Sequence, residues 1–125
     1  MKHLLLTAIF GLIFAGIGQA QNLDDLIKFT RVEHDFGKID QGKPVTATFT
    51  FTNPGNKPLI IEDATAECGC TKPVFPKRPV MPGKSGEISV TYDAAAMGAF
   101  TKRVTVKLIN VKGTKELLIK GDVIK

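Results

Sequence analysis

Tryptophan is absent from this sequence, tyrosine occurs once and cysteine occurs twice. The two cysteines, Cys68 and Cys70, are separated by a single glycine, so they cannot join two strands that are distant in the chain. Antibody-type domains rely on a buried tryptophan that packs against a disulfide between their two sheets. Any domain formed by this sequence must therefore stabilise its core by apolar packing alone.

Blocks of like charge are absent as well, although the chain is basic overall. Lysine and arginine together number 17 and aspartate and glutamate 12, which gives a formal charge of +5. The basic residues stand singly among threonine, valine and glycine, whereas interaction tails carry runs of about five or more like charges. This spacing is typical of a solvated surface, and we expect no nucleic-acid partner.

The chain begins with a segment typical of a signal peptide. Lys2 supplies a positive charge, residues 4–17 are almost wholly apolar, and small residues precede a cleavage site after Ala20. The apolar run has about 14 residues, fewer than the roughly 20 that a membrane-spanning helix needs. We therefore expect residues 1–20 to be removed and the mature chain to be exported to the periplasm, the cell surface or the extracellular space, without an integral membrane segment.

Apolar residues in the remaining chain recur with a period of two. In residues 45–52 the sequence VTATFTFT alternates apolar residues with threonine, which places one face of a strand in a core and a row of threonines on the other. Residues 86–93 and 102–109 repeat this pattern, and residues 31–36, 58–64 and 115–123 show it less regularly. The alternation predicts that Thr48, Thr50 and Thr105 face outward and that the following residues are buried: Phe49, Phe51, Ile88, Val90, Val104 and Val106.

Turn signals separate these segments at intervals of about ten residues. Residues 53–56 (NPGN) place proline at the second and glycine at the left-handed third position of a turn, and residues 82–86 carry a second such signal. Only residues 22–29 suggest a short turn of helix. The sequence predicts an all-β domain, an immunoglobulin-like β-sandwich of about seven antiparallel strands, with a small barrel as the alternative. We assign residues 30–125 to this domain and residues 21–29 to a lead segment.

The run from His34 to Asp93 contains a set of motif residues: Asp35, Phe36, Gly37, Gly42, Phe49, Phe51, Asn53, Gly55, Pro58, Leu59, Cys68, Gly69, Cys70, Thr71, Pro82, Gly83, Ile88, Val90 and Tyr92. With these residues the run resembles the bacterial family catalogued as domain of unknown function 1573. The resemblance implies an exported immunoglobulin-like domain, similar in outline to the domains of major sperm protein and of ciliary proteins, and it implies no established activity.

The Cys68-Gly69-Cys70 triplet has three interpretations. In an extended strand the two Cα atoms would lie about 6.5 to 7 Å apart, so the chain must bend before a disulfide can form, and glycine permits that bend. The pair is then a structural corner, a thiol-redox site, or a soft-metal site for Cu(I) or Zn(II) with His34 as a further ligand. Met81 and Met97 are additional sulfur ligands for the last of these, although isolated methionines usually fill core.

The sequence has few groups of side chains typical of enzyme active sites, so we predict no catalytic residues and no cofactor. The neighbouring carboxylates of residues 33–35 and 62–63 fit a solvated strand surface better than acid–base catalysis. We therefore expect a non-enzymatic, exported module that binds a protein or a cell-envelope polymer, and residues 45–52 could receive a partner's strand if they lie at a sheet edge. The alternative function is a small copper, zinc or thiol-redox carrier that uses Cys68 and Cys70.

Overall fold

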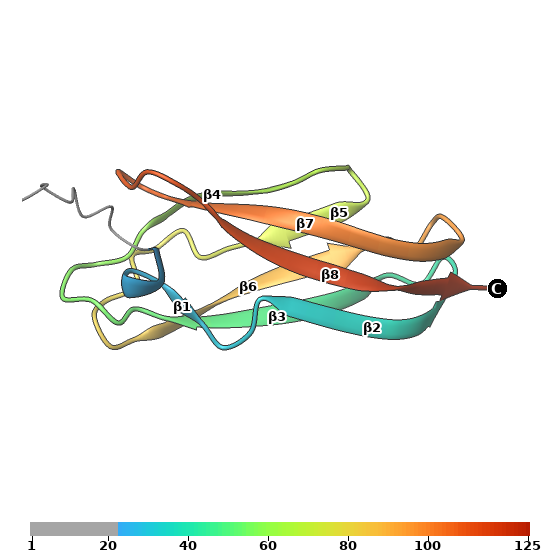
Figure 1. Ribbon diagram of the computed structural model, residues 1–125, viewed down its shortest axis with the longest axis horizontal. Helices are drawn as coiled ribbons and strands as arrows, with labels where there is room; N and C mark the ends of the chain where they lie inside the picture. Colours follow the sequence, from blue (N-terminus) through green and yellow to red (C-terminus); the bar gives the residue numbers. More distant parts are fainter. Residues whose placement is uncertain (1–22) are drawn as a thin grey trace, which may run out of the picture.

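The alternating segments form two four-stranded sheets that pack face to face (Figure 1). The computed structural model describes residues 23–125. The strand order is β1-β3-β6-β5 in the first sheet and β2-β8-β7-β4 in the second. The elements are η1 (Leu23–Asp25), β1 (Lys28–Phe29), β2 (Glu33–Asp40), β3 (Val45–Thr52), β4 (Ile61–Ala66), β5 (Thr71–Val74), β6 (Ser85–Tyr92), β7 (Gly98–Leu108) and β8 (Lys115–Ile124).

The core lies between the two sheets and contains the residues that the alternation predicts. Phe49, Phe51, Ile88 and Val90 are fully buried, and Val104 and Val106 are each 1% exposed. Thr48 is exposed, whereas Thr50 and Thr105 are half-buried. Burying one large aliphatic or aromatic side chain stabilises a fold by about 1.5 to 3 kcal/mol. These side chains therefore account for much of the stability of a domain in which no disulfide joins the two sheets.

The predicted immunoglobulin-like sandwich is confirmed, and two details of it differ from the prediction. The described residues form eight strands, and β2 pairs with β8 in parallel. Both differences arise because the first strand is divided. β1 pairs with β3 in the first sheet, and the chain then crosses over so that β2 joins the second sheet. Ile27, just before β1, is fully buried, so this leading segment packs with the sandwich.

The two predicted proline–glycine turns adopt different conformations. Gly83 has a φ of +78°, and Lys84 N–H donates to Met81 O at 3.0 Å, as expected for a turn with proline second and glycine third. Gly55 lies outside the left-handed region, so the prediction for that glycine is wrong. Its N–H instead donates to the side-chain oxygen of Asn53 at 2.9 Å.

The Asp35-Phe36-Gly37 motif forms a bulge in β2. Gly37 has a φ of +68°, its N–H donates to Asp35 Oδ1 at 2.8 Å, and the pairing with β8 shifts register between Asp35 and Lys38. Phe36 is half-buried and its ring meets the His34 ring edge-on, 4.5 Å between centroids. The motif therefore shapes an edge strand.

In residues 23–125 no helix is long and apolar enough to cross a membrane.

Candidate functional site

β3, the strand expected to receive a partner, is not at an edge, because β1 lies outside it. β1 covers only the last two residues of β3. Beyond that point Thr30 N–H donates to Thr50 O at 2.9 Å, and the Arg31 guanidinium donates to Thr48 O at 3.1 Å. The outward carbonyls along the second half of β3 are therefore already bonded, which leaves little of this side of the strand for a partner.

The true edge strands are also poorly suited to strand addition. β5 has four residues and contains Pro73, which has no N–H to donate. β2 is bulged between Asp35 and Lys38, and β4 shifts register between Ile61 and Asp63. Short strands, prolines, bulges and charges are the features by which sheets avoid edge-to-edge pairing. Among the strands in residues 23–125, none offers a long, flat and unprotected edge.

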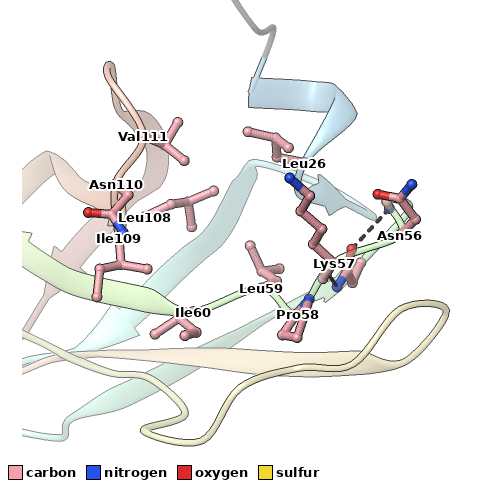
Figure 2. Close-up of a pocket in the computed structure, with 12 residues that line it drawn as sticks. Leu26, Asn56, Lys57, Pro58, Leu59, Ile60, Leu108, Ile109, Asn110 and Val111 are labelled. Atoms are coloured by element: carbon pink, nitrogen blue, oxygen red, sulfur yellow. Dashed lines mark hydrogen bonds between the residues drawn. The ribbon is translucent and has the colours of Figure 1, made fainter.

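An apolar groove of about 800 Å³ opens at the end of the sandwich that carries η1 and the β7–β8 turn. Figure 2 shows Leu26 and Val111 at the top of the view, with Leu108, Leu59 and Ile60 below them. Ile109 is 42% exposed. Among the described residues that line the groove, Lys57 alone carries a charge. The lining residues are Leu26, Asn53, Gly55, Asn56, Lys57, Pro58, Leu59, Ile60, Leu108, Ile109, Asn110 and Val111.

Asn53 holds one wall of the groove in place. Its side chain is 2% exposed, and its amide nitrogen donates to Lys57 O at 2.7 Å and to Val80 O at 2.8 Å. Its amide oxygen accepts the Gly55 N–H, and its two backbone groups bond to the turn at residues 81–84. One buried side chain therefore ties the loop after β3 to the segment before β6. The sequence indicated Asn53 as a turn and motif residue but not as a buried one.

Backbone hydrogen bonds fix the floor and the opposite wall. Leu59 and Val80 exchange two hydrogen bonds, of 2.9 and 2.8 Å, and Ile109 N–H donates to Ile60 O at 3.0 Å. Asn110 follows with a φ of +58°, a conformation that asparagine tolerates better than most residues. The groove is thus preformed by three loops that are far apart in the sequence.

The Cys68-Gly69-Cys70 triplet lies in the turn between β4 and β5, where the chain passes from the second sheet to the first. The two cysteines form a disulfide with their Cα atoms 5.3 Å apart, and Thr71 N–H donates to Cys68 O at 3.3 Å. The chain therefore bends as the pairing requires. Gly69 is outside the left-handed region, and a Cβ added there would meet no atom within 4 Å, so the bend does not depend on glycine.

The Thr71 side chain contacts both sulfurs of this disulfide. It is 3% exposed, and its hydroxyl oxygen lies 3.6 Å from Cys70 Sγ and 3.9 Å from Cys68 Sγ. Cys70 packs against the core, and its carbonyl accepts the Asp93 N–H at 2.9 Å. The sequence marked Thr71 as part of a motif, but nothing in the sequence indicated that its hydroxyl faces both sulfurs.

The structure does not bring the proposed metal ligands together. His34 is in β2 and the cysteines follow β4, which are the opposite edges of one sheet, about 14 Å apart at three strand spacings. Met81 and Met97 are each 53% exposed, so neither fills the core as isolated methionines usually do. Within residues 23–125 no three His, Cys, Asp or Glu side chains are grouped so that they could hold a metal ion.

His34 interacts with its neighbours on β2 and the preceding crossover. Its Nδ1 lies 2.5 Å from Arg31 Nη1. Burial, and then the charge of Arg31, lowers the pKa of His34 from 6.5, while Asp35 acts in the opposite direction. The His34 ring is therefore neutral, and its Nδ1 accepts a hydrogen bond from the Arg31 guanidinium. This bond helps to hold Arg31 beside β3, where it also donates to Thr48 O.

One carboxylate of each neighbouring pair, Glu33 in β2 and Glu62 in β4, belongs to a surface ion pair. Glu33 lies 2.7 Å from Lys120 Nζ, and Glu62 lies 2.6 Å from Lys107 Nζ. The hydrogen bond that Lys120 donates to the Glu33 carboxylate raises the pKa of Lys120. Pairs this exposed contribute little to stability because solvent screens them, and they fit the solvated strand surface that the sequence predicted.

Several solved structures share this fold at low sequence identity. PapD-like domain 7 of human CEP192 is similar with a TM-score of 0.69 and 9% identity, over 100% of this chain and 96% of that one. A Porphyromonas gingivalis W83 protein of unknown function has a TM-score of 0.67 and 16% identity, over 78% of this chain and 46% of that one. The VesB protease of Vibrio cholerae has a TM-score of 0.63 and 15% identity, over 80% of this chain and 32% of that one.

This chain spans less than half the length of the two bacterial proteins. At these identities the likeness shows the fold alone.

No curated protein matches the sequence. Residues 27–123, which include every strand from β1 to β7 and most of β8, match one family over more than half of the chain. The chain therefore belongs to the family described as protein of unknown function (DUF1573).

Proposed function

We propose that this chain is an exported, non-enzymatic binding module whose end groove receives an extended polypeptide segment of a protein partner. The observation that carries the proposal is the preformed apolar groove between η1, the loop after β3 and the β7–β8 turn. Its volume of about 800 Å³ is within the usual range of about 300 to 1,000 Å³ for ligand sites.

The chemistry of the lining favours a polypeptide over a cell-envelope polymer. Aliphatic side chains such as Leu26, Leu59 and Ile109 can pack against apolar side chains of a partner, and the amides of Asn56 and Asn110 can bond to a backbone. Sugars usually require stacked aromatic rings and carboxylate acceptors, and none occurs among the described lining residues. Aliphatic and amide groups do not transfer protons near neutral pH, which supports binding over catalysis.

A photo-crosslinker placed at position 109 in the expressing cell tests the proposal. Ile109 is 42% exposed in the groove, and Ile124 at the end of β8 is 37% exposed and serves as the matched control position. We expect a protein adduct at position 109 and not at 124. A peptide from the adduct should then bind the purified chain, with at least about tenfold weaker binding to Ile109→Asp, because the buried carboxylate has no partner. Adducts to polysaccharide, equal adducts at both positions or no adduct would refute the proposal.

Export is tested separately by sequencing the N-terminus of the protein isolated from the expressing cell. The charged start and the short apolar run favour cleavage after Ala20, so the isolated protein should begin at Gln21. A chain that still begins at Met1 and stays in the cytoplasm would contradict the expectation.

A further inference from the structure

The Cys68–Cys70 disulfide contributes little to holding the sandwich together. It closes a loop with a sequence separation of 2, and the neighbouring backbone is also fixed by the bonds from Thr71 N–H to Cys68 O and from Asp93 N–H to Cys70 O. The stabilisation from a disulfide grows with the length of the loop that it closes. Breaking this bond would therefore leave both sheets and their connections in place.

The disulfide is open to approach from one side. Gly69 is exposed, and the space where a side chain would begin contains no atom within 4 Å. Cys68 and Cys70 are half-buried, so neither sulfur is sealed within the core. Exchange requires that an attacking thiol reach one of the sulfurs, and the partial exposure of both cysteines is compatible with that approach.

The two sulfurs are not equivalent. Cys70 packs against the core and its Sγ is the closer one to the hydroxyl of Thr71, at 3.6 Å against 3.9 Å for Cys68. A hydrogen bond from a buried hydroxyl stabilises a thiolate and lowers the pKa of the corresponding thiol. In thiol–disulfide exchange the sulfur with the lower thiol pKa leaves faster. Packing against the core opposes ionisation of Cys70, so the hydrogen bond from Thr71 is the interaction that favours Cys70 as the leaving sulfur. Cys68, which is outside the core cluster, is then the sulfur that is attacked.

We propose that Cys68–Cys70 is a thiol–disulfide exchange site that accepts two electrons from a dithiol of another protein. One thiolate of that dithiol attacks Cys68 Sγ, the Cys68–Cys70 bond breaks, and Cys70 leaves as a thiolate that accepts a hydrogen bond from Thr71 and then takes a proton. The second thiol of the partner loses its proton and attacks the mixed disulfide, which releases Cys68. The partner becomes a disulfide, and its two electrons and two protons reduce the pair. This site is separate from the groove and does not depend on its function.

An experiment on the unsubstituted protein can show which of the two sulfurs is attacked. The oxidised protein is treated with reduced glutathione, quenched with acid, and fragmented in a mass spectrometer to locate the bound glutathione. We expect the mixed disulfide on Cys68. Glutathione on Cys70, or equally on both cysteines, would overturn the assignment of the attacked and leaving sulfurs.

The role of Thr71 is tested by the rate at which dithiothreitol reduces the disulfide. Thr71→Val removes the hydroxyl and keeps a similar shape, and it should slow reduction by about tenfold because hydrogen bonds to charged groups are the stronger class. Thr71→Ser keeps the hydroxyl and should restore most of the rate. Circular dichroism confirms that each variant is folded. If folded Thr71→Val is reduced as fast as the unchanged protein, or if Thr71→Ser is as slow as Thr71→Val, the proposal fails.

Discussion

Replacing Asn53 with alanine should strongly destabilise the domain. The side chain is 2% exposed and makes three hydrogen bonds, to Lys57 O, Val80 O and Gly55 N–H. At about 1 kcal/mol for each hydrogen bond, the free energy of unfolding should fall by about 3 kcal/mol. For a domain of this size, the melting temperature should fall by about 12 to 24 °C.

Thermal unfolding followed by circular dichroism measures this loss, and Asn56→Ala is the matched control. Asn56 is the same residue type in the same loop, but it is exposed, so its replacement should change stability by no more than about 0.5 kcal/mol. Equal effects of the two substitutions would refute the assignment of Asn53 as the residue that ties this wall of the groove together.

The pH dependence of the stability of the Asn53→Asp variant provides a second test of the same hydrogen bonds. The new carboxylate keeps an acceptor for Gly55 N–H but faces the carbonyls of Lys57 and Val80, which disfavours the ionised form. The pKa of this aspartate should therefore rise above its unfolded value of about 3.9. Because the folded state then binds more protons, the variant should regain stability as the pH falls through the folded pKa. A variant that loses stability over that range, relative to the unchanged protein, would contradict the geometry.

Three further changes test other parts of the fold. Gly86→Ala should cost about 1 to 3 kcal/mol in thermal unfolding, because its Cβ would lie 2.6 Å from Cζ of the fully buried Phe51. Replacing Cys68 and Cys70 together with serine should cost about 1.6 kcal/mol in urea unfolding, the closure entropy of so short a loop, and a loss above about 4 kcal/mol would show that the bridge holds the fold. Since burial lowers the pKa of His34 from 6.5, the unfolded state takes up this proton first as the pH falls. Stability should therefore decline below about pH 6.5, and His34→Gln should remove that part of the decline.

The strands and their buried faces could be predicted because they are encoded locally. A threonine between every two apolar residues of β3 fixes which face points inward, and a shift of one residue would expose Phe49 and Phe51 together. The proline–glycine turn at Gly83 was predicted for the same reason, since its geometry depends on two adjacent residues.

Features that depend on the order of strands in the sheets could not be predicted. β1 has two residues, too few for any alternation, so the protection of β3 was not visible in the sequence. The groove combines residues from three distant loops, and the left-handed turn expected at Gly55 gave way to a bond with Asn53. The separation of His34 from Cys68 likewise follows from the order of the strands in the second sheet.

The parallel pairing of β2 with β8 determines how the domain responds to a pulling force. When the chain is pulled from both ends, the two pairs between β1 and β3 and the bonds from Thr30 and Arg31 to β3 bear the load before β2 does. The load then reaches the start of β2 and the end of β8, from Glu33 to Ile124. Because these strands run in the same direction, the force is parallel to both of them, and their paired positions must slide together rather than open one at a time. The sandwich should therefore resist extension far better along this axis than when β7 and β8 are pulled apart at their shared turn.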